Sequence, residues 1–256
     1  MYLKERLAAG HCLIGAGIWS NSPDILEFAA RGMDWIWWEC QHSHVNWQTT
    51  LHGVRTAFGM KIPLLVRSWT HDVGTIERLL DTGAEGIIVP MIDTAQQAQE
   101  IVSHCYFPPV GRRSYGSIRM LITEEDLHEW NKRIVTVMML ETPESIANAE
   151  AIAKVPGVDA LLIGSADLAM RLGKTPTVHT SHADCKDELE QVVRVCRDTG
   201  KAAAVIASSV EALVARVEEG FRLICAGMDV DHVDAAYKQM KDVFTRITGE
   251  KEFTRD

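Results

Sequence analysis

Residues 134–171 read IVTVMMLETPESIANAEAIAKVPGVDALLIGSADLAMR, and this stretch decides the fold. The run 134–141 is short and apolar, which is typical of a buried strand. Thr142 and Pro143 then open a helical pattern, since a capping residue followed by proline is a common helix start. A second apolar run, 160–163, follows that helix. Two buried strands joined by a helix predict a parallel βαβ unit.

The same alternation of short apolar runs and amphipathic stretches extends through the chain. Eight runs are predicted strands: Leu13–Trp19, Asp34–Glu39, Ile62–Arg67, Gly86–Pro90, Ile134–Glu141, Ala160–Ile163, Ala202–Ala207 and Arg222–Ala226. Helices are predicted to begin at Ser22–Pro23, Asp72, Thr94, Thr142–Pro143 and Ser208–Ser209, and three of them to end at Gly32, Gly83 and Gly220.

Eight strand–helix units in 256 residues predict an α/β protein, a (β/α)8 TIM barrel in which residues 1–256 form a single domain. The alternative is an open, doubly wound sheet. It is disfavoured because the first strand is not followed by G-x-G-x-x-G; the segment GAGIWS contains the bulky Trp19 instead. No long linker and no internal repeat marks a second domain.

The composition is that of an ordinary globular chain, with 46% hydrophobic and 24% charged residues and a net charge of −9. The negative balance disfavours nucleic acid as a partner, because such partners require a basic surface. No segment is typical of a signal peptide or a membrane span, so no membrane association is expected. The six cysteines include no C-x-x-C pair, which favours reduced thiols and a cytoplasmic location.

Polar side chains follow several predicted strands at the point where each strand ends. Glu39-Cys40-Gln41-His42 closes the second run, Arg67 the third and Glu141 the fifth, and the sixth continues into Gly164-Ser165-Ala166-Asp167. Barrel enzymes carry their catalytic groups at the carboxyl ends of the strands. A structural role is open for each alone: Glu141 could favour a helix start, Asp167 could be an N-cap and His42 could be exposed. Their convergence on one face favours a functional site.

The chemistry of these groups is specific when they are taken together. Glu141 and Asp167 offer hard oxygen ligands on adjacent strands, which suit Mg²⁺ or Mn²⁺. Arg67, a cation closing an apolar strand, can stabilise an oxyanion. Backbone N–H groups around Gly164 and Ala166 can hold a carboxylate. The set indicates an enzyme that stabilises the enolate of a 2-oxo acid. A Schiff-base aldolase is disfavoured because Lys61, Lys132 and Lys201 precede strands.

On these residues the chain resembles the HpcH/HpaI family, the class II, metal-dependent pyruvate aldolases that include enzymes for 4-hydroxy-2-oxoheptanedioate and 2-dehydro-3-deoxyglucarate. The resemblance covers essentially the whole chain. Its strongest segments are VRSWTHDVGTIERLLDTGAEGIIVPMIDTAQQA, YFPPVGRRSYG, ETPESIANAEAIAKVPGVDALLIGSADLA and GFRLICAGMD. It implies a barrel like the phosphoenolpyruvate/pyruvate domains, usually hexameric, whose C-terminal helix is exchanged between subunits. It also implies a role in breaking down aromatic compounds or sugar acids.

The resemblance also implies roles for individual residues. Glu141 and Asp167 would ligate Mg²⁺ or Mn²⁺, with Co²⁺ a further candidate. Pyruvate would bind that metal through its carboxylate and keto oxygens. The resemblance places Arg67 on the keto or enolate oxygen, and makes His42 the catalytic base with Asp81 as its acidic partner. It places Gly164, Ser165 and Ala166 on the substrate carboxylate. Trp19 would form a wall of the pocket.

The sequence departs from the family at the end of the second strand. The family commonly has Asp-x-Glu-His there, whereas this chain has Glu39-Cys40-Gln41-His42. Glu39 would support the site from behind the ligands, and Gln41 can still accept a hydrogen bond but adds no charge. We therefore expect weaker metal binding. The segment after GRRSYG is also unusual, and Arg112, Arg113 and Arg119 could bind an acceptor carboxylate or simply be exposed.

The sequence thus predicts a divalent-metal-dependent aldolase that cleaves 4-hydroxy-2-oxo acids to pyruvate and an aldehyde, and that also catalyses the reverse addition. Two alternatives remain open. One is a lyase of the same superfamily that acts on an acyl-CoA thioester, as citrate lyase does. The other is a catalytically impaired barrel that binds 2-oxo acids, for which the Gln41 substitution is the only support.

Overall fold

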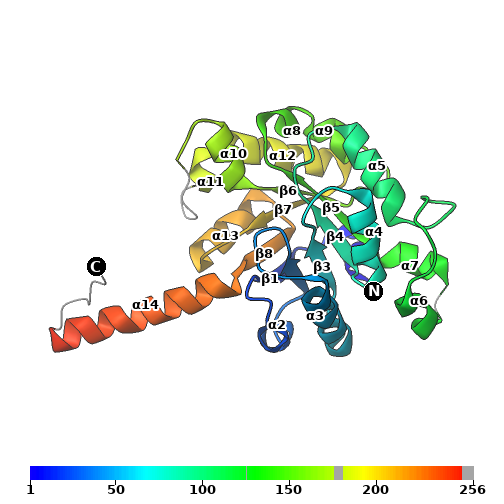
Figure 1. The fold of residues 1–256 in the computed structure, drawn as a ribbon. Helices are drawn as coiled ribbons and strands as arrows, with labels where there is room; N and C mark the ends of the chain where they lie inside the picture. The colour runs from blue at the N-terminus through cyan, green and yellow to red at the C-terminus, as the bar shows by residue number, and fades with distance from the viewer. Residues whose placement is uncertain (125, 176–180, 250–256) are drawn as a thin grey trace.

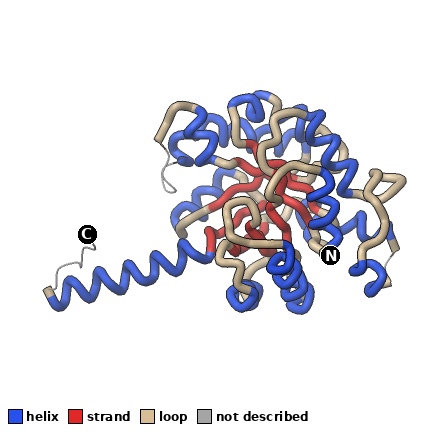
Figure 2. Tube along the Cα trace, viewed as in Figure 1, coloured by secondary structure: helices blue, strands red, loops and turns tan. Residues whose placement is uncertain are grey.

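Eight parallel strands close into one barrel in which each strand pairs with the next along the chain and β8 pairs with β1. The computed structural model describes residues 1–124, 126–175 and 181–249. The strands lie at the centre and the helices surround them (Figures 1 and 2). The predicted (β/α)8 barrel is confirmed.

The eight strands follow one another in chain order around the barrel. They are β1 Leu13–Ile18, β2 Trp35–Glu39, β3 Leu64–Arg67, β4 Gly86–Val89, β5 Val135–Leu140, β6 Ala160–Ile163, β7 Ala202–Ile206 and β8 Leu223–Met228. The described helices are α1 Leu3–Ala8, α2 Pro23–Ala30, α3 Trp47–Met60, α4 Val73–Asp81, α5 Ala95–Cys105, α6 Ile118–Thr123, α7 Leu127–Arg133, α8 Pro143–Ala147, α9 Ala149–Ala153, α10 Ser165–Arg171, α11 Ser181–Asp184, α12 Lys186–Thr199, α13 Val210–Glu219 and α14 Asp229–Thr248.

Each predicted strand is present, with ends that differ by two residues at most. The predicted caps also form, because the side chains of Ser22, Asp72 and Ser209 accept hydrogen bonds from the first turns of their helices. The predicted end of α2 at Gly32 differs in detail from the structure. The helix closes at Arg31, and Gly32 does not adopt the left-handed conformation. Helix α1 has no counterpart among the helices predicted from the sequence.

The barrel interior is filled by side chains that alternate along the strands. Trp35 and Trp37 of β2 point inward and are fully buried there, whereas Trp38 packs in the layer between strands and helices. The amphipathic α1 contributes Leu3 and Leu7 to the same interior cluster.

The same alternation places the candidate site. Inward positions on β2 are Trp35 and Trp37, so the next inward position is Glu39. The same two-residue alternation makes Arg67 the next inward position after Leu65 on β3, and Glu141 the next inward position after Met139 on β5. The side chains that end these strands therefore face the same space above the barrel core.

The last helix, α14, leaves the barrel and projects from it (Figure 1). It contacts little of its own chain apart from β1 and β8. Five of the six cysteines are buried and Cys12 is exposed; all six are free thiols. Within the described residues, no helix combines the length and the apolar character needed to cross a membrane.

The close contact between Gly15 and the Trp35 ring allows the packing of the barrel interior to be tested by mutation. These residues are partners in the β1–β2 register, and a Cβ on Gly15 would lie 2.4 Å from the Trp35 ring. We expect Gly15→Ala to lower the unfolding temperature by several degrees, since overpacking a core costs about 1–3 kcal/mol. Gly32→Ala is the control, because nothing lies within 4 Å of its added methyl group. Equal unfolding temperatures for the two variants would contradict this packing.

Candidate active site

The carboxylate of Glu39 organises one side of the site. Glu39 is fully buried, and its Oε2 accepts hydrogen bonds from Arg67 Nε at 2.5 Å and from Trp37 Nε1 at 3.0 Å. Its Oε1 accepts from the backbone amide of His42 at 2.9 Å. One carboxylate therefore fixes both the cation at the end of β3 and the loop that carries His42.

Arg67 is held from one side and open on the other. Only 7% of the residue is exposed, its guanidinium lies 5.3 Å from the Trp37 ring, and its Nη1 contacts Met139 Sδ at 3.7 Å. Within the described residues, the hydrogen bonds of Arg67 use Nε and Nη1 and leave Nη2 without a protein partner. A charged donor held in this way can bind a developing oxyanion.

The loop after β2 lies against Trp19. Trp19 Nε1 donates a hydrogen bond to the His42 carbonyl at 2.9 Å, and the Trp19 amide donates to Asp229 at 2.8 Å. The His42 side chain is exposed, as a general base that meets substrate must be before binding. Gln41 Oε1 is buried and has no hydrogen-bond partner. An unpartnered buried acceptor at this position is suited to a donor that arrives with a ligand.

Glu141 follows β5 and is almost fully buried. Its Oε1 accepts a hydrogen bond from the Met91 amide at 2.9 Å. The pKa of the Glu141 carboxyl is raised to about 7, chiefly by burial and also by the nearby charge of Asp167, while the Met91 amide and the charges of Arg67 and Arg171 act against the rise. The carboxylate is therefore in an environment that disfavours its charge unless a cation binds.

Gly164 and Asp167 belong to the turn from β6 into α10. Gly164 is the N-cap of α10, so the structural role considered for Asp167 as a cap is wrong; Asp167 lies in the first turn of the helix. A Cβ on Gly164 would lie 2.7 Å from Glu141 Cγ and 2.8 Å from its Oε2. Glycine is therefore required for this backbone to approach Glu141. Ser165 is buried and Ala166 is exposed.

The donor set fits a divalent cation that completes its shell with substrate oxygens and water. Glu141 and Asp167 supply two carboxylates from the ends of the neighbouring strands β5 and β6. Across residues 1–124, 126–175 and 181–249, no group of three or more His, Cys, Asp or Glu side chains could hold a metal by itself. Two protein carboxylates with open positions are typical of Mg²⁺ sites.

The structure does not bring Asp81 to His42 within one chain. Asp81 is the last residue of α4, and its Oδ1 pairs with Arg113 Nη2 at 2.7 Å. Because α4 returns from the end of β3 to the start of β4, Asp81 lies at the end of the barrel opposite His42. An intramolecular His42–Asp81 pair is therefore not formed.

The three arginines considered for binding an acceptor carboxylate also lie away from the carboxyl ends of the strands. Arg113 is buried and stacks over Phe107 at 4.6 Å, and Arg119 lies 4.5 Å from the Phe58 ring. Arg112 is the exposed member of the group. The physical reason is topological: residues 106–134 connect the end of α5 to the start of β5, at the amino-terminal end of the barrel.

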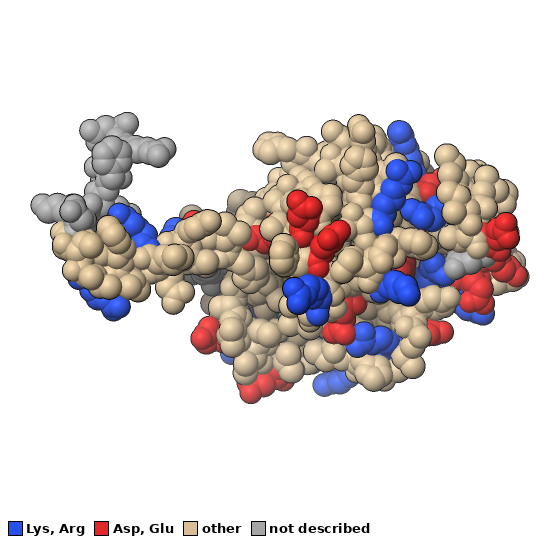
Figure 3. Space-filling model, turned by 90° about the horizontal axis from the view of Figure 1, so that it is seen from below, with Lys and Arg blue, Asp and Glu red and all other residues tan. Residues whose placement is uncertain are grey.

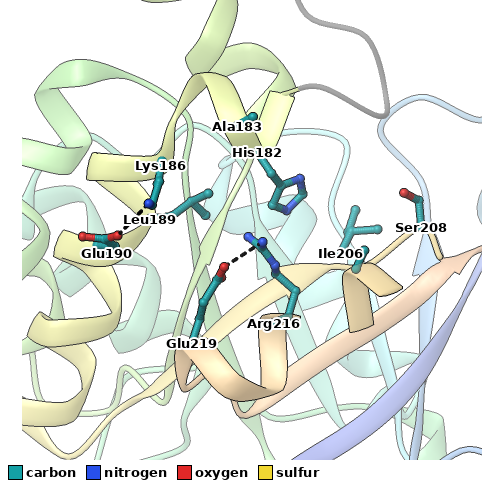
Figure 4. Close-up of a pocket in the computed structure, with 10 residues that line it drawn as sticks. His182, Ala183, Lys186, Leu189, Glu190, Ile206, Ser208, Arg216 and Glu219 are labelled. Atoms are coloured by element: carbon teal, nitrogen blue, oxygen red, sulfur yellow. Dashed lines mark ion pairs between the residues drawn. The ribbon is translucent and has the colours of Figure 1, made fainter. Parts of the chain in front are cut away.

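A second pocket, of about 370 Å³, lies outside the barrel between α12 and α13 (Figure 4). His182 and Arg216 point toward each other there, and burial lowers the pKa of His182 to about 4, helped by the charge of Arg216. The cationic side chains of this pocket have acidic partners, since Arg216 pairs with Glu219 at 2.8 Å and Lys186 pairs with Glu190 at 3.8 Å. No predicted site residue lines this pocket, so we assign the chemistry to the strand ends.

The family model described as HpcH/HpaI aldolase/citrate lyase matches residues 17–236. The chain belongs to this family. Curated HpcH/HpaI relatives include a hydroxypyruvate/pyruvate aldolase of Cupriavidus necator, 30% identical over 89% of this chain and 86% of the relative. Another is a 4-hydroxy-2-oxo-heptane-1,7-dioate aldolase of Salmonella dublin, 30% identical over 88% of both chains. The chain is thus a carbon–carbon lyase of the aldolase type.

Solved structures agree with this assignment. The HpcH/HpaI aldolase from Desulfitobacterium hafniense superposes with a TM-score of 0.88 at 26% identity, covering 98% of this chain and all of that one. A citrate lyase beta subunit from M. tuberculosis, complexed with oxaloacetate and magnesium, has a TM-score of 0.59 at 13% identity, over 87% of this chain and 93% of that one. That second likeness concerns the fold alone.

The raised pKa of Glu141 predicts how pH affects the stability of the metal-free HpcH/HpaI enzyme. A carboxyl whose pKa is higher folded than unfolded contributes stability that is lost as pH rises, here between about 4.5 and 7. In EDTA we expect Glu141→Gln to be more stable than the wild type at pH 8, by up to about 3 kcal/mol, and equal to it near pH 4.5. Urea unfolding at both pH values measures this. A constant difference between the two proteins would contradict the burial of the charge.

Proposed function

We propose that this enzyme cleaves 4-hydroxy-2-oxo acids to pyruvate and an aldehyde, with a divalent cation, and that it also catalyses the reverse addition. The observation that carries the proposal is the unpartnered side of Arg67, which Glu39 holds next to the carboxylate of Glu141. The names of the curated relatives support the substrate class, since pyruvate, hydroxypyruvate and 4-hydroxy-2-oxo acids are all 2-oxo acids.

Glu141 and Asp167 would hold Mg²⁺, Mn²⁺ or Co²⁺, and Gln41 would lie beside it. The cation would supply Lewis-acid stabilisation of negative charge on the 2-oxo acid. Supporting this choice, burial of Glu141 disfavours a bare carboxylate there, and an M. tuberculosis protein of the same fold has been seen with magnesium.

The chain's own groups orient the substrate. Backbone N–H groups of Ser165 and Ala166, where no side chain caps α10, would bind its carboxylate. The Gly164 N–H does not contribute as predicted, because it donates to the Leu140 carbonyl at 3.0 Å. Arg67 Nη2 would donate to the keto oxygen, and Trp19 would form a wall beside the His42 loop. The substrate would then lie between the ends of β3 and β6.

Cleavage needs one proton acceptor and one group that stabilises charge. His42 removes the proton of the C4 hydroxyl, the C3–C4 bond breaks, and its electron pair moves to give the C2–C3 enolate while C4 leaves as the aldehyde. The negative charge of the enolate oxygen develops next to Arg67. Protonation at C3 then yields pyruvate, so atoms and charge balance.

Arg67 gives the most direct test by mutation. Arg67→Ala should lower kcat of retro-aldol cleavage about 100- to 1,000-fold, as the loss of an oxyanion donor does elsewhere. Arg67→Lys keeps the charge without the planar donors and should recover only part of the loss. A coupled assay for pyruvate measures both. Near-normal cleavage by Arg67→Ala would show that this role is wrong.

Gln41 should limit the affinity for the metal. Gln41→Glu adds a negative charge at a buried, unpartnered acceptor that we place near the metal, so we expect Mn²⁺ to bind several-fold more tightly in calorimetric titration. The control is Gln48→Glu, which adds the same charge at an exposed position of α3. Unchanged or weaker binding by Gln41→Glu alone would contradict the placement of Gln41 at the metal.

We propose that His42 and Asp81 pair between two copies of the chain, since the fold separates them within one. The helix α14 supports self-association. Apolar residues recur along α14 at intervals of three and four, and form an exposed stripe: Val230, Val233, Tyr237, Met240, Phe244 and Ile247. Figure 3 shows α14 extending from the barrel with few charged side chains on the visible face. A hexamer with exchanged C-terminal helices would cover this stripe.

Mixing two inactive variants tests the pairing between copies. His42→Ala and Asp81→Asn should each be poorly active, because each lacks one member of the pair. After dissociation and joint reassembly, about a quarter of the sites would combine an intact His42 with an intact Asp81, and cleavage should return accordingly. No recovery in properly reassembled mixtures would contradict an intersubunit pair.

We also propose a cytoplasmic location, with pyruvate, an aldehyde and a 4-hydroxy-2-oxo acid as the small-molecule partners. The location is supported by the six free thiols, because unpaired buried cysteines are typical of reducing compartments. Burial also raises the pKa of thiols such as Cys105 and Cys225 to about 12, which keeps them protonated and unreactive.

A further inference from the structure

An arginine lies next to the two carboxylates of the site without belonging to the chemistry derived above. Arg171 is the last residue of α10, four residues after Asp167. Residues four apart lie on the same face of a helix, and one helical turn spans about 5.4 Å. Arg171 is therefore one turn farther out than Asp167 on the face that Asp167 turns toward the site.

The side chain of Arg171 reaches back across the site. Its Nη2 lies 3.8 Å from Met91 Sδ, and the Met91 amide is the donor that holds Glu141. Met91 follows β4, so the guanidinium extends from the β6 side of the barrel mouth to the β4–β5 side. Its charge also acts to lower the pKa of Glu141, in agreement with this closeness.

Among the residues that the structure describes, no carboxylate oxygen lies within ion-pair distance of the Arg171 guanidinium. By contrast, Arg67, Arg113 and Arg216 are each paired with an acidic side chain. Arg171 is also exposed, so its donors are accessible from solvent. A cation without a partner at the mouth of a site attracts anionic ligands and can bind them by charge-assisted hydrogen bonds.

We propose that Arg171 selects the aldehyde by binding a carboxylate at its far end, so that the enzyme prefers aldehydes that carry a terminal carboxylate. This inference rests on the proposed function and names its acceptor class. Guanidinium binds carboxylate through two parallel hydrogen bonds. A phosphate site would require more donors than one arginine, such as several backbone N–H groups.

The test compares two aldehydes of equal length, 4-oxobutanoate and butanal, as acceptors for pyruvate. Wild-type enzyme should have a higher kcat/KM for 4-oxobutanoate. Arg171→Met should lower that value about 10- to 100-fold, the worth of a hydrogen bond to a charged group, and leave the value for butanal unchanged. Arg171→Glu should prefer butanal. The matched control is Lys174→Met, which removes another exposed cation three residues after Arg171 and should keep the wild-type preference.

Each other outcome overturns the inference in a distinguishable way. Equal use of the two aldehydes by wild type and by Arg171→Met removes the acceptor role and leaves the proposed function intact. A higher KM for pyruvate, or weaker Mn²⁺ binding, at an unchanged aldehyde preference would mean that Arg171 serves pyruvate or the carboxylates instead. If the wild-type enzyme, loaded with Mn²⁺, adds pyruvate to neither these nor other aldehydes, the proposed function fails and the inference fails with it.

Discussion

The buried ion pair between Glu39 and Arg67 is the interaction on which the rest of the site depends. Neither side chain is accessible enough for water to replace its partner, and breaking such a pair costs about 3–5 kcal/mol. Glu39 also holds the His42 amide and the Trp37 indole. The cation, the base-bearing loop and the core of the barrel are therefore connected through one carboxylate.

On the opposite side of the mouth, Glu141 is held in an unfavourable environment rather than a stabilising one. Its burial disfavours the charged form, and the Met91 amide together with the charges of Arg67 and Arg171 compensates only in part. Gly164 permits this arrangement, since any side chain there would collide with the carboxylate. The buried charge of Glu141 thus lowers the stability of the folded protein at the position where the family chemistry needs a charged ligand. A bound cation would restore that stability.

The sequence was sufficient for the barrel and for the position of the polar residues that end its strands, because both follow from local patterns. Alternation along β2 and β5 places Glu39 and Glu141 at the inward end of their strands, and the pattern is visible without a structure. Long-range contacts were not predictable: no local signal shows that Asp81 faces Arg113, or that Arg171 lies over Met91. The end of the barrel at which residues 106–134 lie likewise emerges only from the complete fold, because it depends on where α5 ends and β5 begins.

The central claim is that this chain stabilises the enolate of pyruvate between Arg67 and the two carboxylates. Exchange of the methyl protons of pyruvate in D₂O, followed by NMR, tests it without knowledge of the aldehyde. We expect exchange with Mg²⁺ or Mn²⁺ that stops in EDTA and returns when the metal is restored. Absence of exchange with any divalent metal, in a folded sample that binds pyruvate, would contradict it.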